Sequence, residues 1–237
     1  MKALFVSGTD TEVGKTWVSS HILQILRQSG YRVGAWKPVC SGAIECEGRQ
    51  IWQDIQALAN AVEGHQLCAM TEFDSAMINR ICAQRFELPM APNMAARYEN
   101  RTVSDDHLMA GPEAWIGHAE LVLIEGAGGL LSPASDTMLG ADLAAHLKTP
   151  ILLVAANRLG TIHQTLATVE AARARDLSIV GVVLNEAASE ASDTLKAANE
   201  SELRRLLPDI RLLATSHNSP QPLQDAVSEI QSWFAEM

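Results

Sequence analysis

The residues that are most clearly able to bind a ligand or take part in catalysis lie near the start of the 237-residue chain. There Gly8 to Thr16 read Gly-Thr-Asp-Thr-Glu-Val-Gly-Lys-Thr. An apolar run precedes this stretch and a helix-like stretch follows it, and N–H groups in such a loop can surround a polyphosphate. Lys15 would reach the β- and γ-phosphates, and the Thr16 hydroxyl would bind Mg²⁺. The common pattern G-x-x-x-x-G-K-[ST] would need glycine at Thr9, so this loop is one residue longer than usual. Its context nevertheless predicts that the chain binds ATP or GTP.

A second group of candidate residues follows another apolar run, where Leu121 to Ile124 precede Glu125-Gly126-Ala127-Gly128-Gly129. In nucleotide-binding sheets a carboxylate that terminates an apolar strand can face the metal, and the glycines let the backbone approach a ligand. The alternative is a glycine-rich turn with no ligand. Asp136 and Asp142, further along, are interpreted as structural or capping residues.

A third group is Lys37-Pro38-Val39-Cys40-Ser41-Gly42, after the run Val33–Trp36. Pro38 holds Lys37 extended at the strand end, where its ammonium could meet an anion or a solvated surface. Ser41 could offer a hydroxyl to a ligand or simply form a turn. Asp54, near the start of the next helix, could bind Mg²⁺ or compensate the helix dipole.

Two further strand ends carry polar groups. Asn185 follows the run Ile179–Leu184 and could pair with adenine N6 and N7, although a strand-end Asn is also a common turn residue. Thr161 begins a helix after the run Ile151–Ala155, and the free N–H groups of a helix start can bind an anion.

The elements that must position these residues are short apolar runs without alternation, separated by helix-periodic stretches. Such strands are buried on both faces, as in a parallel sheet, and such sheets bind ligands at the carboxyl ends of their strands. The sequence predicts an α/β fold, a single domain over residues 1–237 with a mostly parallel sheet flanked by helices on both faces. The expected strands are Ala3–Val6, Val33–Trp36, Leu121–Ile124, Ile151–Ala155, Ile179–Leu184 and Ile210–Leu213.

Helices and irregular segments are expected between these strands. The expected helices are Trp17–Gln28, Gln50–Val62, one near Ala95, one from Ser104 towards His118, one from Thr161, Ala191–Leu207 and Leu223–Phe234. Glu45–Arg49 is expected to be a loop, and Thr71–Asn93 an extended segment.

Composition narrows the class of function. A formal net charge of −10 argues against nucleic acid or an anionic membrane as the main partner, and 47% hydrophobic residues indicate a globular chain. The four cysteines form no metal-binding or redox pair, so reduced thiols are expected. Without a leader-like start or an apolar run of ~20 residues, a cytoplasmic location is expected.

Taken together, Gly8–Thr16, Lys37–Gly42, Asp54 and Glu125–Gly129 resemble the dethiobiotin synthetase family, the ATP-dependent carboxylases of biotin synthesis with a P-loop NTPase fold. The resemblance covers nearly the whole chain. It extends to two further residues, Asn79 and Asn185, and to two further segments, Pro89–Ala96 and Leu159–His163.

The resemblance implies an activity. Enzymes of this family form a cyclic urea from 7,8-diaminopelargonate, CO₂ and ATP, with Mg²⁺. A substrate amine becomes a carbamate, whose oxygen attacks the γ-phosphorus; the second amine then attacks the carbamic-phosphoric anhydride and closes the ring. The family also implies a homodimer, in which a helix start of the partner subunit holds the substrate carboxylate.

The resemblance also implies residue roles. Lys15 and Lys37 would be catalytic, and Thr16, Asp54 and Glu125 would hold the metal. The nucleotide-binding residues would be Thr11, Glu12, Val13, Gly14, Lys15, Thr16, Trp17, Asp54, Glu125, Gly126, Ala127, Gly128 and Asn185. The substrate-binding residues would be Ser41, Thr161, Ile162 and His163, the last three matching the helix start of a partner subunit.

The sequence departs from the family pattern in two places. Asn93 stands where the family commonly has histidine, and Ala214–Pro220 lacks the Gly-x-Ile-Pro pattern of the loop beside the adenine. The second departure leaves the base contacts, and the preference for ATP over other nucleotides, open.

Three alternatives remain beside the family. A regulatory or partitioning ATPase would usually carry a second lysine near the loop start, where this chain has Ser7-Gly8-Thr9. A cobyrinate-type ligase would normally need an appended glutaminase domain. The third is a non-catalytic paralogue, which only the altered adenine loop favours.

Overall fold

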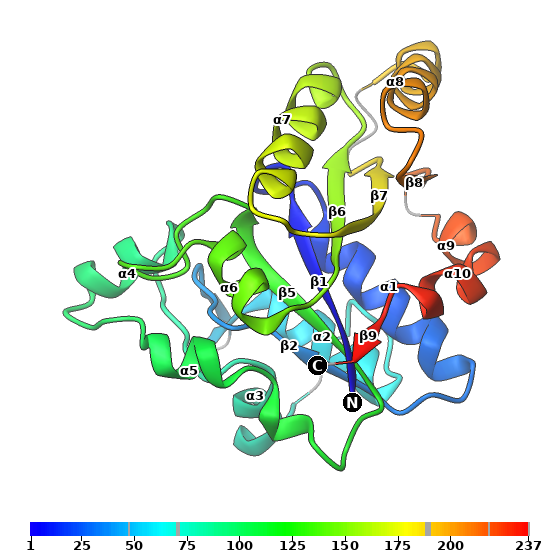
Figure 1. The fold of residues 1–237 in the computed structure, drawn as a ribbon. Coiled ribbons are helices and arrows are strands. Elements are labelled where there is room, and N and C mark those ends of the chain that lie inside the picture. Colours follow the sequence, from blue (N-terminus) through cyan, green and yellow to red (C-terminus); the bar gives the residue numbers. More distant parts are fainter. Residues whose placement is uncertain (47, 70–71, 188–190, 218, 237) are drawn as a thin grey trace.

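The core of the protein is a parallel β-sheet (Figure 1). The computed structural model describes residues 1–46, 48–69, 72–187, 191–217 and 219–236. Strands pair in the order β2-β5-β1-β6-β7-β8, all parallel, as the unalternated apolar runs predicted. Their bounds are β1 Lys2–Gly8, β2 Val33–Trp36, β5 Leu121–Gly129, β6 Ile151–Ala156, β7 Ile179–Asn185 and β8 Arg211–Ala214.

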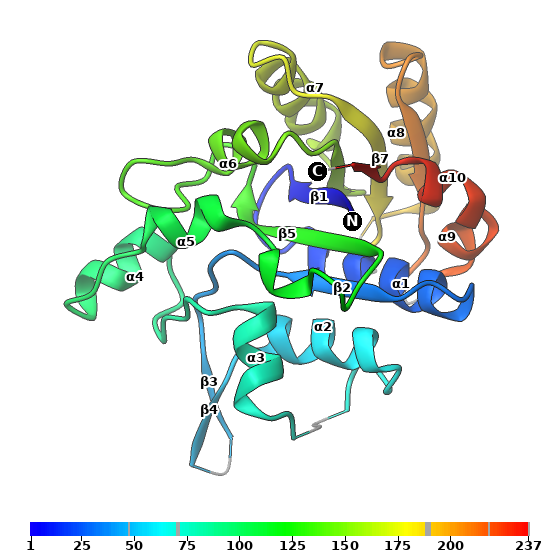
Figure 2. The ribbon, with the colours of Figure 1, turned by 60° about the horizontal axis from the view of Figure 1, so that its bottom comes forward.

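Helices cover both faces of this sheet, so the predicted fold class is confirmed. Figure 2 shows α1 (Lys15–Gln28) and α2 (Gln53–Glu63) on one face, with α6 (Gly140–Leu147) and α7 (Thr161–Arg173) on the other. Every residue of β6 is buried, as expected for a strand covered on both sides. The boundaries of a domain over residues 1–237 stay a prediction.

The register of the sheet brings three candidate residues to one edge. Val6 of β1 pairs with Glu125 of β5, so the loop after β1 and the Glu125 carboxylate emerge together. Trp36 of β2 pairs with Ile124, which places Lys37 beside Glu125. Contrary to expectation, β5 does not end at the carboxylate, because pairing of Gly129 with Gly8 extends the strand.

The segment between β2 and α2 was predicted incorrectly as a loop over Glu45–Arg49. Its described residues form an antiparallel hairpin of β3 (Ile44–Cys46) and β4 (Arg49–Ile51), with Gly48 at φ 77° in the turn. These strands are short and mostly exposed, so they carry no apolar pattern. Because β4 occupies Ile51, α2 starts at Gln53 and not at Gln50.

The expected extended segment over Thr71–Asn93 contains a helix, α3 (Ser75–Ile81), so that prediction was wrong in part; Thr71 lies outside the described residues. The Asp74 carboxylate accepts the Met77 N–H at 2.7 Å, the N-cap pattern that sequence analysis missed.

The two expected helices beyond this segment are also present. The helix expected near Ala95 is α4 (Pro92–Tyr98). The helix from Ser104 is α5 (Asp105–Ala110), which stops before Gly111 instead of approaching His118. A 3-10 turn over Glu113–Trp115 follows it.

The last part of the chain also differs from expectation. The helix α8 (Asp193–Leu206) is close to the prediction, but the closing helix divides at Ala226 into α9 (Gln221–Asp225) and α10 (Val227–Ser232). A two-residue strand, β9 (Ala235–Glu236), then pairs antiparallel with Lys2 and Ala3 of β1. Since β6 pairs only with the second half of β1, β9 takes the position beside the first half (Figure 1).

Close packing at Gly34 of β2 generates a stability prediction. A Cβ there would lie 2.6 Å from the Trp115 ring, whose Nε1–H donates to the Ala35 carbonyl at 2.8 Å. Gly34→Ala should therefore lower the free energy of unfolding by about 1–3 kcal/mol in urea denaturation. In a Trp115→Leu background the cost should shrink. An equal cost in both backgrounds would contradict the contact.

Candidate active site

A cleft of about 760 Å³ opens at the carboxyl ends of β1, β2 and β5, and it gathers most of the predicted site residues. The predicted residues that line it are Thr11, Glu12, Gly14, Lys15, Thr16, Trp17, Lys37, Ser41, Asp54, Ala127 and Gly128. The remaining lining residues were not among the predicted site residues: Cys40 and Gly42 belong to the Lys37–Gly42 group and Pro89, Met90, Ala91 and Pro92 to the Pro89–Ala96 segment, whereas Ser132, Pro133 and Ala187 lie outside every segment singled out in the sequence. Most of these are small or apolar, so their types carry no chemical pattern.

The loop after β1 has the geometry of an anion cradle. Glu12 and Gly14 have φ of 55° and 88°, so the chain turns sharply before α1 begins at Lys15. The buried Lys15 ammonium donates to the Asp10 carbonyl at 3.1 Å, over the loop. No side chain caps the start of α1, so its free N–H groups can bind a phosphate.

A buried ion network forms the floor of the cleft. The Lys37 ammonium, 3% exposed, lies 2.7 Å from Asp54 Oδ2 and 2.7 Å from Glu125 Oε1. The Thr16 hydroxyl donates to the same Glu125 oxygen at 2.8 Å. Lys37, one of the two lysines assigned to catalysis, thus pairs with both carboxylates assigned to the metal, and Thr16 joins the network through Glu125.

The electrostatics of the network follow from burial and charge. Burial alone would lower the pKa of Lys37, but the carboxylates of Asp54 and Glu125 outweigh it and raise that pKa well above its ordinary value. The charge of Lys37 in turn lowers the pKa of Asp54. Burial, and then the nearby Lys37 charge, lower the pKa of Lys15, so its ammonium would gain from a bound anion.

The donor set of this floor fits a magnesium ion. Glu125 Oε2 is buried and has no hydrogen-bond partner among the described residues, although a buried carboxylate oxygen without one is costly. Mg²⁺ commonly takes one or two carboxylates together with waters and substrate phosphates. The described residues contain no cluster of three or more His, Cys, Asp or Glu side chains that could hold a metal. The candidate ligands are therefore the two carboxylates Asp54 and Glu125 and the Thr16 hydroxyl.

Four predicted nucleotide-site residues do not line the cleft: the buried Glu125 described above, and Val13, Gly126 and Asn185, which lie behind the cleft wall. Val13 is buried under the loop, and Gly126 packs against Phe5, whose ring would lie 3.1 Å from a Cβ there. Asn185 Nδ2 donates to the Val13 carbonyl at 3.0 Å, and Asn185 Oδ1 accepts from the Thr215 hydroxyl at 2.9 Å. Pairing of Asn185 with adenine stays a prediction.

The predicted substrate residues separate into two groups. Ser41 lies in the cleft wall, where its hydroxyl donates to the Met90 carbonyl at 2.6 Å. Thr161, Ile162 and His163 begin α7, and the cleft of their own chain does not include them. Within the part of the chain that the structure describes, the start of α7 has no side-chain cap and the buried Thr161 hydroxyl has no hydrogen-bond partner.

Residues outside the network account for the remaining predictions. Asp142 accepts the Leu139 N–H at 2.9 Å and caps α6, as predicted. Asp136 pairs with Arg97 at 2.6 Å and accepts from Asn93 at 3.3 Å, so it too has a structural role. Within residues 214–220, the stretch that the family resemblance places beside the adenine, Asn218 lies outside the described residues.

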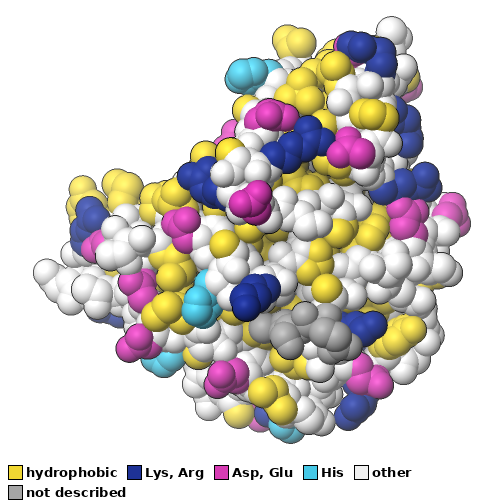
Figure 3. Space-filling view, viewed as in Figure 1, with side chains coloured by type: hydrophobic (Ala, Val, Ile, Leu, Met, Phe, Trp, Pro, Cys, Tyr) yellow, Lys and Arg dark blue, Asp and Glu magenta, His cyan; other side chains and the backbone are white. Residues whose placement is uncertain are grey.

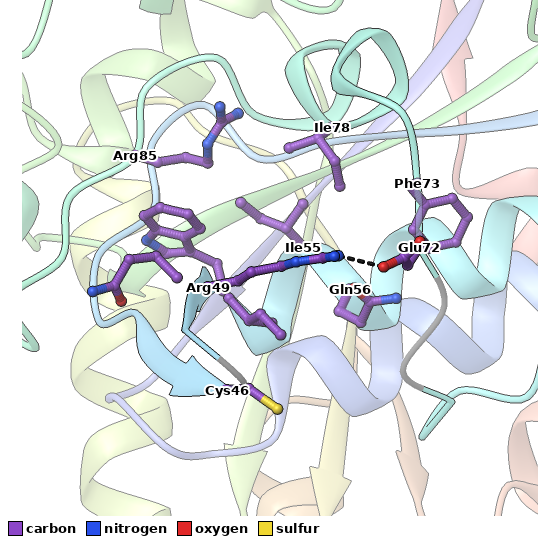
Figure 4. Close-up of a pocket in the computed structure, with 11 residues that line it drawn as sticks. Cys46, Arg49, Ile55, Gln56, Glu72, Phe73, Ile78 and Arg85 are labelled. Carbon is purple, nitrogen blue, oxygen red and sulfur yellow. Dashed lines mark hydrogen bonds and ion pairs between the residues drawn. The ribbon is translucent and has the colours of Figure 1, made fainter.

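Another cavity, of about 340 Å³, lies beneath the β3–β4 hairpin (Figure 4). Arg49 extends across it to pair with Glu72, while Ile55 and Ile78 approach each other from α2 and α3. The Trp52 indole in its wall donates to the Phe86 carbonyl at 2.8 Å. It contains none of the predicted catalytic or metal-binding residues.

The fold agrees with comparisons to known proteins. A family model described as an AAA domain matches residues 2–218. The MinC:MinD cell division complex of Aquifex aeolicus gives a TM-score of 0.59 at 11% identity, over 100% of this chain and 98% of that chain. The cell division ATPase MinD of Pyrococcus furiosus gives 0.54 at 16% identity, over 97% and 89%. These structures share the fold alone, which, with the loop before α1, defines a P-loop NTPase.

Relatives in sequence are more specific. A protein of Rhodopirellula baltica is 35% identical over 212 residues, which is 85% of this chain and 78% of the relative. One from Anaeromyxobacter sp. (strain K) is 38% identical, over 87% and 86% of the two chains, and one from Caulobacter vibrioides is 39% identical, over 78% and 80%. All three are named ATP-dependent dethiobiotin synthetase. The chain belongs to this family of enzymes, so the predicted resemblance is confirmed.

The thiol of Cys40 in the cleft wall generates a chemical prediction. Burial raises its pKa to about 12, so at pH 9 only about one-thousandth is ionised. Because the thiolate is the reactive form, iodoacetamide between pH 7 and 9 should leave Cys40 unmodified while it labels the exposed Cys68. Peptide mass spectrometry measures both, with guanidinium-unfolded protein as the control. Similar labelling rates in the folded protein would refute the prediction.

Proposed function

We propose that this protein catalyses the ATP-dependent ring closure of 7,8-diaminopelargonate with CO₂ to dethiobiotin. The observation that carries the proposal is the buried Lys37 ammonium, held between Asp54 and Glu125 beside the phosphate loop. Membership of the dethiobiotin synthetase family supports the substrate and the product.

The reaction requires positioning and charge neutralisation more than covalent help from the protein. An amine of the substrate adds to CO₂ and loses a proton, giving a carbamate. The carbamate oxygen attacks the γ-phosphorus and ADP leaves. The second amine then attacks the carbonyl carbon of the carbamic-phosphoric anhydride, which releases phosphate and closes the cyclic urea.

The two lysines could neutralise the negative charges on the phosphates, the carbamate and the transferring phosphoryl group. Lys15 would bind the β- and γ-phosphates, and Lys37 would stabilise the carbamate and the transferring phosphoryl group. A raised pKa keeps Lys37 positively charged at neutral pH, as that role requires. Thr16, Asp54 and Glu125 would hold Mg²⁺, which when bound neutralises phosphate charge.

The substrate site would be completed by a second copy of the chain. Ser41 would contact the substrate within the cleft, while Thr161, Ile162 and His163 of the partner subunit would hold its carboxylate. The uncapped start of α7 and the unpartnered Thr161 hydroxyl support this arrangement, since both can receive an anion. A homodimer is therefore part of the proposal.

The remaining partners would be small molecules in the cytoplasm. Figure 3 shows Lys and Arg side chains interspersed with Asp and Glu on the face it presents, and the formal net charge is −10. This balance disfavours nucleic acid and anionic membranes as partners. Throughout the part of the chain that the structure describes, no helix combines the length and the apolar character needed to span a bilayer.

Turnover tests the proposed function directly. Purified protein with MgATP and bicarbonate should release ADP only when 7,8-diaminopelargonate is added, with dethiobiotin appearing in equal amount by mass spectrometry. ATP hydrolysis that does not depend on the diamine and is stimulated by DNA or lipid vesicles would overturn the proposal and indicate a partitioning ATPase.

Loss of Lys37 tests the assigned mechanism. Lys37→Met should reduce kcat by at least about 10²-fold, because one electrostatic stabiliser of the transition state is typically worth that much. Lys2→Met, at an exposed lysine, is the control. Since Lys37→Met also leaves two carboxylates uncompensated, Lys37→Met/Glu125→Gln serves as a folded reference. Near-normal kcat in Lys37→Met would remove Lys37 from the mechanism.

A further inference from the structure

The end of β7 is joined to the phosphate loop by a chain of buried hydrogen bonds. The Thr215 hydroxyl donates to Asn185 Oδ1 at 2.9 Å, and Asn185 Nδ2 donates to the Val13 carbonyl at 3.0 Å. Thr215 and Asn185 are 5% and 3% exposed, so water does not readily replace either bond. Thr215 follows β8 and belongs to Ala214–Pro220, the stretch that departs from the family pattern, but it was not among the predicted site residues.

The second bond of this chain controls the direction of an N–H group in the loop. In a trans peptide the C=O and the following N–H are coplanar and point in opposite directions. Because the Val13 carbonyl points at Asn185, the Gly14 N–H points the opposite way. The tight fit requires glycine, since a Cβ at Gly14 would lie 2.0 Å from Asn185 Nδ2. Gly14 lines the cleft, and its carbonyl accepts the Val18 N–H at 3.0 Å at the start of α1.

The first bond selects the orientation of the Asn185 amide. If the amide turned over, Oδ1 would face the Val13 carbonyl, and two acceptors would repel each other. The Thr215 hydroxyl favours the observed orientation by donating to Oδ1. Its own position is set by the backbone, because the Thr215 N–H donates to the Leu184 carbonyl at 2.9 Å.

We propose that Thr215 is a positioning residue for polyphosphate binding, acting through Asn185 on the Val13–Gly14 peptide. This inference rests on the proposed binding of ATP at the loop and extends it to a residue beyond the cleft. The consequence is specific: loss of the Thr215 hydroxyl weakens binding of the phosphates whatever base is attached to them. Contact of Asn185 with the base would instead make the loss depend on adenine.

Isothermal titration calorimetry with two probes, ADP and inorganic tripolyphosphate, both with Mg²⁺, tests the proposal. Thr215→Val keeps the shape of the side chain and removes the hydroxyl, and it should raise Kd for both probes by the same factor, about fivefold. KM for ATP should rise equally while kcat stays within about twofold, because Lys15 and Lys37 are untouched. Thr215→Ser should restore wild-type binding.

The control is Thr149→Val, which removes a buried hydroxyl that has no hydrogen-bond partner and lies outside the lining of the cleft. It should leave both Kd values unchanged. Thermal unfolding of all variants confirms that they are folded at the titration temperature, and Thr215→Ala repeats the test if the valine variant is not.

Three results would overturn the proposal. Unchanged binding of both probes by Thr215→Val would show that the hydroxyl does not act on the loop. If Thr215→Val weakened the binding of ADP but not that of tripolyphosphate, Asn185 would contact the base instead of orienting the loop. Failure of wild-type protein to bind tripolyphosphate would show that the loop does not hold phosphates by itself. Because these are binding measurements, they stay informative even if the protein does not turn over 7,8-diaminopelargonate.

Discussion

An ammonium group that is buried away from water needs carboxylates around it to offset the lost hydration. The buried Lys37 ammonium beneath the cleft is stabilised in this way. Lys37 comes from the end of β2, Asp54 from the first turn of α2 and Glu125 from within β5, so one cation joins three separate elements. Thr16 adds α1 through its bond to the same Glu125 oxygen. The network therefore connects Lys37, one of the two lysines proposed for catalysis, with all three proposed metal ligands, and loss of any one of its three charged groups alters the charge balance of the other two.

Around this network, one negatively charged group and one positively charged group lack full stabilisation. Glu125 Oε2 has no partner, while burial and the neighbouring Lys37 charge make the Lys15 ammonium less favourable than in water. A divalent cation bound together with a polyphosphate would stabilise both groups, since the cation would pair with the Glu125 carboxylate and the phosphates with the Lys15 ammonium. This complementarity, more than the overall shape of the cleft, supports the proposed nucleotide site over a purely structural ion pair.

Much of the site was predictable because its residues stand at strand ends. Apolar runs without alternation indicated a parallel sheet, and polar residues just after such runs must meet at one edge. The order of strands was not predictable, because the adjacency of Lys37 and Glu125 depends on the pairing of β2 with β5. The missed strands, β3, β4 and β9, are short, and tertiary contacts rather than local pattern decide them. Thr215 was missed for a similar reason, since its partner Asn185 lies 30 residues away.

The central place of β1 has a consequence for how the chain is made. Lys2 to Val6 pair with Leu121 to Glu125, and Phe5 to Gly8 pair with residues from Ile151 onward. At about 5–20 residues per second, a ribosome needs on the order of ten seconds to add the intervening stretch. During that interval a nascent strand that is almost wholly apolar has no neighbours to pair with. The strand that leads into the proposed phosphate loop is thus synthesised well before the strands that pair with it.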